Sequence, residues 1–133
     1  MAETQGSNPI KAVGRVMIPV SDQDRAIEFY REHLGFQTIV DVPFGDGNRW
    51  VEVALSGGGT TLALVPPGPQ STVGVDTRIA LDTDDIDALH AELKEAGVDV
   101  DDEVSRLGSE VPPLCWFRDP DGNTLMLVQP TQG

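Results

Sequence analysis

Apolar and polar positions alternate along the chain in two patterns, one typical of strands and one typical of helices. In the first half, an apolar strand at residues 15–20 precedes a helix whose apolar side chains recur at spacings of three and four. Ser21 or Asp22 can cap this helix through a side-chain oxygen, and Gly35 suits its end. A strand at 37–42 follows. The next segments predict a hairpin with strands at 50–55 and 61–65.

The same order returns in the second half, which makes the chain an internal repeat. The segment TLALVPP at 61–67 and the segment TLMLVQP at 124–130 share five of seven residues at an offset of 63. The same offset pairs Arg15 with Arg78. Asp84 or Asp85 caps the second helix, which ends at Gly97. We therefore predict two copies of a unit of roughly 60 residues.

The second unit is expected to end in a strand at 98–104, a loop to about Pro113 and a hairpin. The tip of that hairpin is the turn sequence at 119–122. One unit alone would leave a half-covered sheet, so the two units must pack together. The resulting prediction is an α+β chain of two tandem βαβββ units. The expected limits are a polar tail at 1–9, one domain at 10–130, and units at about 12–67 and 74–130.

Composition and charge exclude several classes of function. Acidic residues outnumber basic residues 22 to 9, and the net charge of −13 would repel nucleic acids and anionic membranes. No apolar run reaches the roughly 18 residues of a membrane helix, and residues 1–9 contain no apolar targeting stretch. A single cysteine, Cys115, permits no intrachain disulfide. We expect a cytoplasmic protein that binds neither nucleic acid nor membrane.

Several motifs, in this order, are similar to those of one known superfamily. They are VSD at 20–22, AIEFY at 26–30, LGF at 34–36, IAL at 79–81, DDI at 84–86 and DPDGN at 119–123. The order resembles that of the vicinal oxygen chelate superfamily, which includes glyoxalase I, bleomycin-resistance proteins and extradiol dioxygenases. The resemblance covers about residues 13–129 and implies the glyoxalase/bleomycin-resistance fold, a cupped mixed sheet. It leaves function open, because this fold hosts isomerases, dioxygenases, thiol transferases and binding proteins.

The resemblance also implies where a metal would be bound. Metal-using members take a His or Glu from the first and last strand of each unit, and these positions fall on Arg15, Ala63, Arg78 and Met126. A guanidinium has no free lone pair, alanine offers no donor, and a thioether is too soft for the expected ions. We therefore expect no metal and no other cofactor.

The first hairpin and the two arginines supply the first candidate ligand-binding residues. If the hairpin closes symmetrically, Glu52 lies opposite Ala63, and Trp50 shares its face. Arg15 and Arg78, if they point inward, either bind an anionic group of a ligand or pair with an internal carboxylate, Glu52 first. Both alternatives stay open here.

The second hairpin supplies the others. By the equivalent argument, Cys115 and Phe117 face the same way as Met126, and Trp116 faces a helix. Cys115 is expected to be an inert buried thiol. The candidate ligand-binding set is Arg15, Trp50, Glu52, Ala63, Arg78, Cys115, Phe117 and Met126.

We therefore expect a protein of the glyoxalase/bleomycin-resistance type that binds a small organic molecule, with sequestration of a drug or metabolite as its role. The resemblance further implies a homodimer. Two enzyme alternatives remain: a metal-dependent lyase, isomerase or dioxygenase with other ligands, and a metal-independent enzyme. In the latter, Arg15 or Arg78 stabilises an oxyanion and Glu52 moves a proton. A third alternative is a structural or regulatory domain with a filled cup.

Overall fold

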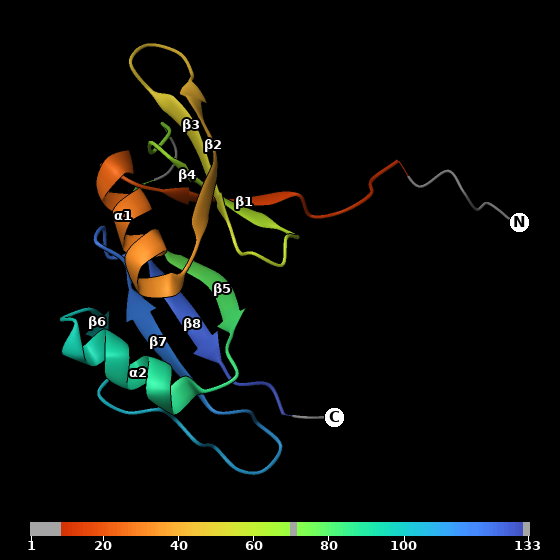
Figure 1. The fold of residues 1–133 in the computed structure, drawn as a ribbon, viewed down its shortest axis with the longest axis vertical. Coiled ribbons are helices and arrows are strands. Elements are labelled where there is room, and N and C mark those ends of the chain that lie inside the picture. The colour runs from red at the N-terminus through yellow and green to blue at the C-terminus, as the bar shows by residue number, and fades with distance from the viewer. Residues whose placement is uncertain (1–8, 70–71, 132–133) are drawn as a thin grey trace, which may run out of the picture.

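A computed structural model describes residues 9–69 and 72–131 of the chain (Figure 1). The first half contains β1 (Arg15–Pro19), α1 (Gln23–Leu34), β2 (Gln37–Pro43), β3 (Arg49–Ala54) and β4 (Thr61–Val65). The second half contains β5 (Asp76–Asp82), α2 (Ile86–Glu95), β6 (Asp99–Val100), β7 (Leu114–Arg118) and β8 (Thr124–Val128). The predicted α+β fold of two βαβββ units is confirmed. The predicted tail at 1–9 lies, except for Pro9, outside the described residues, and the domain limits stay a prediction.

Each half forms its own four-stranded mixed sheet. The strand orders are β1-β4-β3-β2 and β5-β8-β7-β6, with a parallel β1–β4 pair matched by a parallel β5–β8 pair. Met17 pairs with Ala63 in the first sheet, and Ala80 pairs with Met126 in the second. Both members of the second pair lie 63 residues after their counterparts, so the offset read from the sequence is also an offset in sheet register.

The strand predicted at 98–104 is wrong in length, because β6 has only two residues. Its ladder with β7 ends where the Asp101 carboxylate accepts the Trp116 N–H at 3.1 Å, although the Asp101 N–H still donates to the Trp116 carbonyl. Beyond this point, only an isolated bridge joins Ser105 to Leu114. Acidic side chains are poor strand formers, and here one of them replaces a ladder acceptor.

Both helices begin at aspartate caps. The Asp22 carboxylate accepts the Arg25 N–H at 3.1 Å, and the Asp85 carboxylate accepts the Ala88 N–H at 3.0 Å, which decides between the alternatives left by the sequence. Gly35 ends α1 in the left-handed conformation with φ of 79°. With 12 and 10 residues, neither helix of the described ranges is long enough to cross a bilayer.

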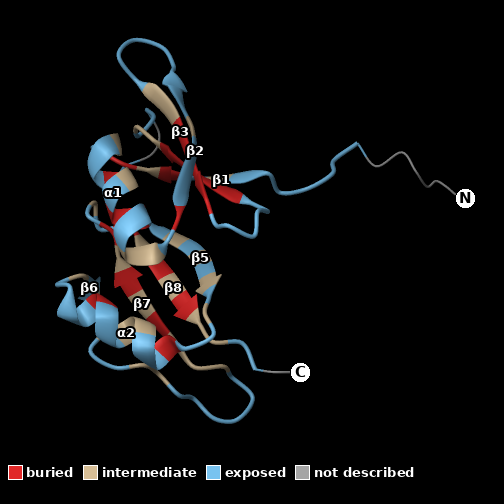
Figure 2. Cartoon of the chain, viewed as in Figure 1, coloured by how far each residue is buried: buried red, intermediate tan, exposed pale blue. Residues whose placement is uncertain are grey.

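The two helices cover one side of the sheets and leave the other side open (Figures 1 and 2). Strand alternation places Ile18, Val51 and Leu64 on the helix side, where they are fully buried. The halves share one core, in which the Phe29 ring of α1 stacks on Phe117 of β7 at 6.2 Å between centroids. We call the sheet side turned away from the helices the open face.

A buried polar network joins the two halves at the turn between β7 and β8. The Tyr30 hydroxyl donates to Asp119 at 2.9 Å, and burial, followed by the Asp119 charge, raises the pKa of Tyr30 well above its usual range. Asn123 is fully buried and donates to the Pro19 carbonyl at 2.8 Å. Its oxygen accepts the backbone N–H groups of residues 74–75. The turn therefore ties β1 to β5 through one amide side chain.

We expect Asn123→Ala to lower the free energy of unfolding by about 2–4 kcal/mol, because it removes a fully buried amide together with its hydrogen bonds to the part-buried Pro19 carbonyl and two backbone N–H groups. Urea denaturation followed by circular dichroism measures the loss. The matched control is Thr60→Ala, 63 residues earlier, whose exposed hydroxyl donates to the Val13 carbonyl. It should cost less than about 1 kcal/mol, and equal losses in the two variants would contradict this account.

Candidate functional site

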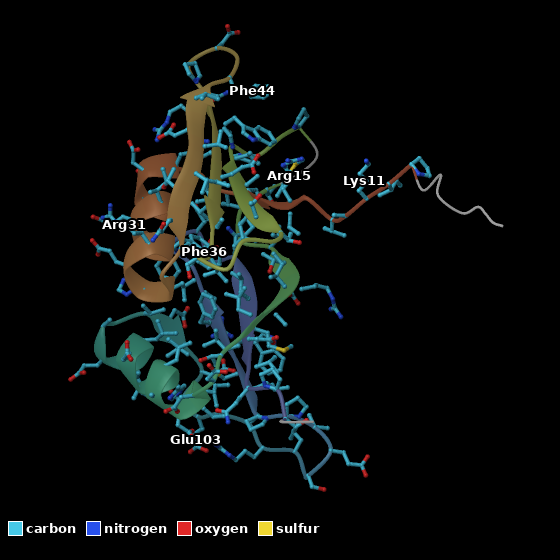
Figure 3. All side chains as sticks on the ribbon, turned by 45° about the vertical axis from the view of Figure 1, so that its right-hand side comes forward. Lys11, Arg15, Arg31, Phe36, Phe44 and Glu103 are labelled. Carbon is cyan, nitrogen blue, oxygen red and sulfur yellow. The ribbon has the colours of Figure 1, made fainter. Side chains whose placement is uncertain are left out.

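The open face of the first sheet brings together most of the first-half candidates. Glu52 pairs with Ala63 across β3 and β4, which confirms the predicted register. Arg15 pairs with Thr61 across β1 and β4, so alternation puts it on the same face. In Figure 3, Arg15 lies on the side of the sheet away from α1, which carries Arg31.

The Glu52 carboxylate is the centre of this face. It accepts hydrogen bonds from Trp50 Nε1 at 2.6 Å, Thr61 Oγ1 at 2.8 Å and Arg15 Nε at 3.0 Å, and the residue is 7% exposed. The Trp50 hydrogen bond, followed by that of Thr61 and the Arg15 charge, holds the pKa of Glu52 below its usual value. Of the two alternatives for Arg15, the internal ion pair is present.

An apolar patch extends from this cluster. Trp50 meets the Phe44 ring edge-on at 5.5 Å between centroids, and it pairs with Val42 across β2 and β3. Met17 lies on the same face, and Met17 and Phe44 are each 59% exposed. We call Met17, Val42, Phe44 and Trp50 the first-sheet apolar patch. Exposed apolar side chains gathered on one face are typical of binding surfaces.

The facing prediction for the second hairpin is wrong. Trp116, not Cys115 or Phe117, pairs with Met126, and the other two are fully buried on the helix side. The turn at 119–123 has five residues where the first hairpin has six, and a one-residue change moves every side chain of a strand to the opposite face. Burial raises the pKa of Cys115 to about 11, as expected of an inert thiol.

The open face of the second sheet contains a small cavity of about 180 Å³. Its lining residues are Asp76, Arg78, Ile79, Trp116 and Met126. None of the first-sheet candidates lines this cavity. Arg15 and Arg78 therefore do not both line it, although the sequence predicted that they share one cleft. Arg78 differs from Arg15 in exposure, since its side chain is 84% exposed.

The four positions implied for a metal do not fit one. The Arg15 guanidinium is engaged by Glu52, Ala63 is fully buried without a donor atom, and Arg78 and Met126 supply no oxygen or imidazole. Throughout residues 9–69 and 72–131, no group of three or more His, Cys, Asp or Glu side chains is arranged to hold a metal ion.

A wider cavity of about 430 Å³ lies away from the open faces, where α1 meets the end of β7. Its lining includes Phe29, His33, Arg118 and Asp119. The Arg118 guanidinium is held by Asp101 at 3.1 Å, and Asp119 by Tyr30. Arg118 and Asp119 are thus held by other protein groups, whereas the Arg78 side chain on the second open face is 84% exposed and lies 3.9 Å from its carboxylate partner, so that face is the stronger candidate for a charged ligand.

Several residues of the open faces were missed by sequence reasoning, among them Thr61, Trp116 and Asp76. Thr61 shares the parity of Ala63 and was therefore within reach of the same argument. The position of Trp116 on the open face follows only when the turn at 119–123 is counted as one residue shorter than the turn of the first hairpin. Asp76 gave no signal, because the internal repeat pairs Arg15, where the first strand was expected to begin, with Arg78 and not with Asp76.

Comparisons with known proteins agree with this fold. The model of the Glyoxalase/Bleomycin resistance protein/Dioxygenase superfamily matches residues 12–127. The structure of TnmS3, an antibiotic binding protein from Streptomyces sp. CB03234, is 40% identical with a TM-score of 0.80, covering 92% of this chain and 98% of that one.

Two further proteins are similar to this chain, one a member of the same superfamily and the other named as an enzyme. A superfamily member from Sphaerobacter thermophilus DSM 20745 is 34% identical with a TM-score of 0.85, covering 92% of this chain and all of that one. A probable lactoylglutathione lyase from Vibrio parahaemolyticus is 28% identical, covering 87% of this chain and 88% of that protein.

Glu52 should make stability depend on pH in a defined direction. Because its pKa is lowered in the folded state, its ionised form stabilises the fold above the unfolded pKa of about 4.3. This contribution disappears as pH falls through the folded pKa. The difference in unfolding free energy between wild type and Glu52→Gln should therefore be largest near pH 7 and shrink below about pH 4.

Urea denaturation at several pH values measures this difference. Asp87→Asn is the control, since Asp87 is an exposed carboxylate paired with Arg106 and exposed ion pairs contribute little to stability. A Glu52→Gln difference that stays constant from pH 7 to pH 3 would contradict the role given to the cluster.

Proposed function

Because the chain belongs to the Glyoxalase/Bleomycin resistance protein/Dioxygenase superfamily, we propose that it binds a small organic molecule on its open sheet faces without a metal. The observation that carries the proposal is the chemistry of Arg15, Ala63, Arg78 and Met126. These residues replace metal donors by two cations, a methyl group and a thioether.

Sequestration of a drug or metabolite is the role that the similarities favour. The antibiotic binding protein from Streptomyces is 40% identical over nearly the whole chain. Both open faces of this chain carry an indole, Trp50 in the first half and Trp116 in the second. Aromatic and thioether side chains suit flat organic ligands, because they offer large contact area with few rotamers to fix.

We also propose that the protein is a homodimer, in keeping with the family resemblance. The first-sheet apolar patch leaves Met17 and Phe44 more than half exposed. A second copy laid over the patch would remove this apolar surface from water and would close the open faces into deeper ligand sites.

The similarity to a probable lactoylglutathione lyase supports the alternative that this chain is an enzyme. A metal-independent reaction through Glu52 is disfavoured by its environment. Three donors hold its carboxylate, and its lowered pKa is far from the neutral value that suits proton transfer. The binding role therefore accounts better for these side chains.

Binding should be measurable in protein dialysed against EDTA. The probes are 2-naphthoate, 2-naphthamide and 2-naphthylmethylammonium, which share one ring system and differ in charge. We expect saturable binding of at least one probe by calorimetry, and a shift in one of the two tryptophan indole N–H signals by NMR. Trp50→Phe assigns the signals to the two halves.

Addition of Zn²⁺ or Ni²⁺ should leave the affinity unchanged. Binding that appears only after a divalent ion is restored, or turnover of a hemithioacetal that requires one, would contradict the proposal. Absence of saturable binding for all three probes would also contradict it.

A further inference from the structure

The two halves differ at the residue that pairs with the middle of the last strand, opposite Ala63 in the first half and Met126 in the second. In the first sheet, Glu52 pairs with Ala63 and receives the Arg15 guanidinium. In the second sheet, the residue that pairs with Met126 is Trp116. An aromatic ring thus occupies the place that the carboxylate holds in the first half, and Arg78 has no equivalent of Glu52.

The backbone of Arg78 is unusual as well. Among the described residues, it alone is a non-glycine with positive φ, at 60°, and it lies where the β5–β8 register shifts between Asp76 and Ala80. The Asp76 carboxylate accepts its N–H at 3.1 Å, and the Thr77 hydroxyl donates to the Thr124 carbonyl at 2.8 Å. Bulges of this kind re-aim a side chain, and strained conformations concentrate at functional sites.

The Arg78 guanidinium is weakly paired. Its Nη1 lies 3.9 Å from Asp76 Oδ2, and the Asp76 side chain is itself 60% exposed. A guanidinium offers five donors in a planar fork that matches a carboxylate. Arg78 therefore presents a cation beside Trp116 and Met126 in the same cavity.

We propose that this cavity holds an aromatic ring with an acidic substituent, the ring against Trp116 and Met126 and the carboxylate on Arg78. This inference rests on the proposed function and names its ligand class. The cavity of about 180 Å³ matches a group of one or two rings, since an apolar cavity of about 150 Å³ holds benzene. The net charge of −13 repels anions in general, so a preference for the acid has to come from local contact with Arg78.

Calorimetric titration of the full chain with 2-naphthoate and 2-naphthamide tests this, because the probes differ in charge and little in shape. We expect 2-naphthoate to bind at least about tenfold more tightly, as a charge-assisted bidentate contact would give. Arg78→Gln should abolish the preference and leave 2-naphthamide within about threefold of wild type. Arg78→Gly, which favours positive φ, should do the same and separates the side chain from the backbone strain.

Asp76→Asn should strengthen 2-naphthoate binding, because it removes the competing carboxylate while its amide oxygen still accepts the Arg78 N–H. The charge control is Arg106→Gln, an exposed arginine paired with Asp87 outside the cavity, which should keep the preference.

Three outcomes would overturn the inference. Equal binding of the two probes would do so and leave the proposed function intact. Loss of the preference in Arg15→Gln but not in Arg78→Gln would place the anion in the first half. Absence of binding by both probes, with 2-naphthylmethylammonium bound, would assign the opposite ligand charge.

Discussion

Strand alternation is the constraint on which the site depends. A strand can offer only every second side chain to the open face, and the turn of each hairpin decides which residues meet across it. A six-residue turn places Glu52 opposite Ala63, whereas the five-residue turn at 119–123 places Trp116 opposite Met126. A difference of one residue in turn length therefore gives the first unit a carboxylate on its open face and gives the second unit an aromatic ring at the equivalent place.

This difference separates the roles of the two arginines. In the first half, Arg15, Trp50 and Thr61 converge on a buried carboxylate, and the cation is neutralised within the protein. In the second half, the cation at Arg78 is exposed on a bulged strand beside an indole. The two units therefore differ in the chemistry of their open faces. The open face of the first unit is charge-balanced, and the open face of the second unit combines an exposed cation with an aromatic ring.

The element order, the start of each helix to within one residue and the glutamate–alanine register could be predicted from the sequence, because they follow from local periodicity and from an internal repeat. The facing of Cys115 and Phe117 was predicted wrongly, because the internal repeat suggests equal hairpins although the second turn is one residue shorter than the first. The brevity of β6 depends on Asp101 capturing a backbone N–H, and the bulge at Arg78 depends on Asp76 and Thr77. Such side-chain competition for the backbone leaves no periodic signal.

The central claim is the proposal that the open faces bind an organic ligand without a metal, at the positions where the family resemblance implies a metal ion. Mass-spectrometric metal analysis of untagged protein, purified without chelators and quantified against protein concentration, tests the claim most directly. The account predicts that manganese, iron, nickel and zinc each remain far below one ion per chain. One tightly held ion per chain, retained through gel filtration, would contradict it.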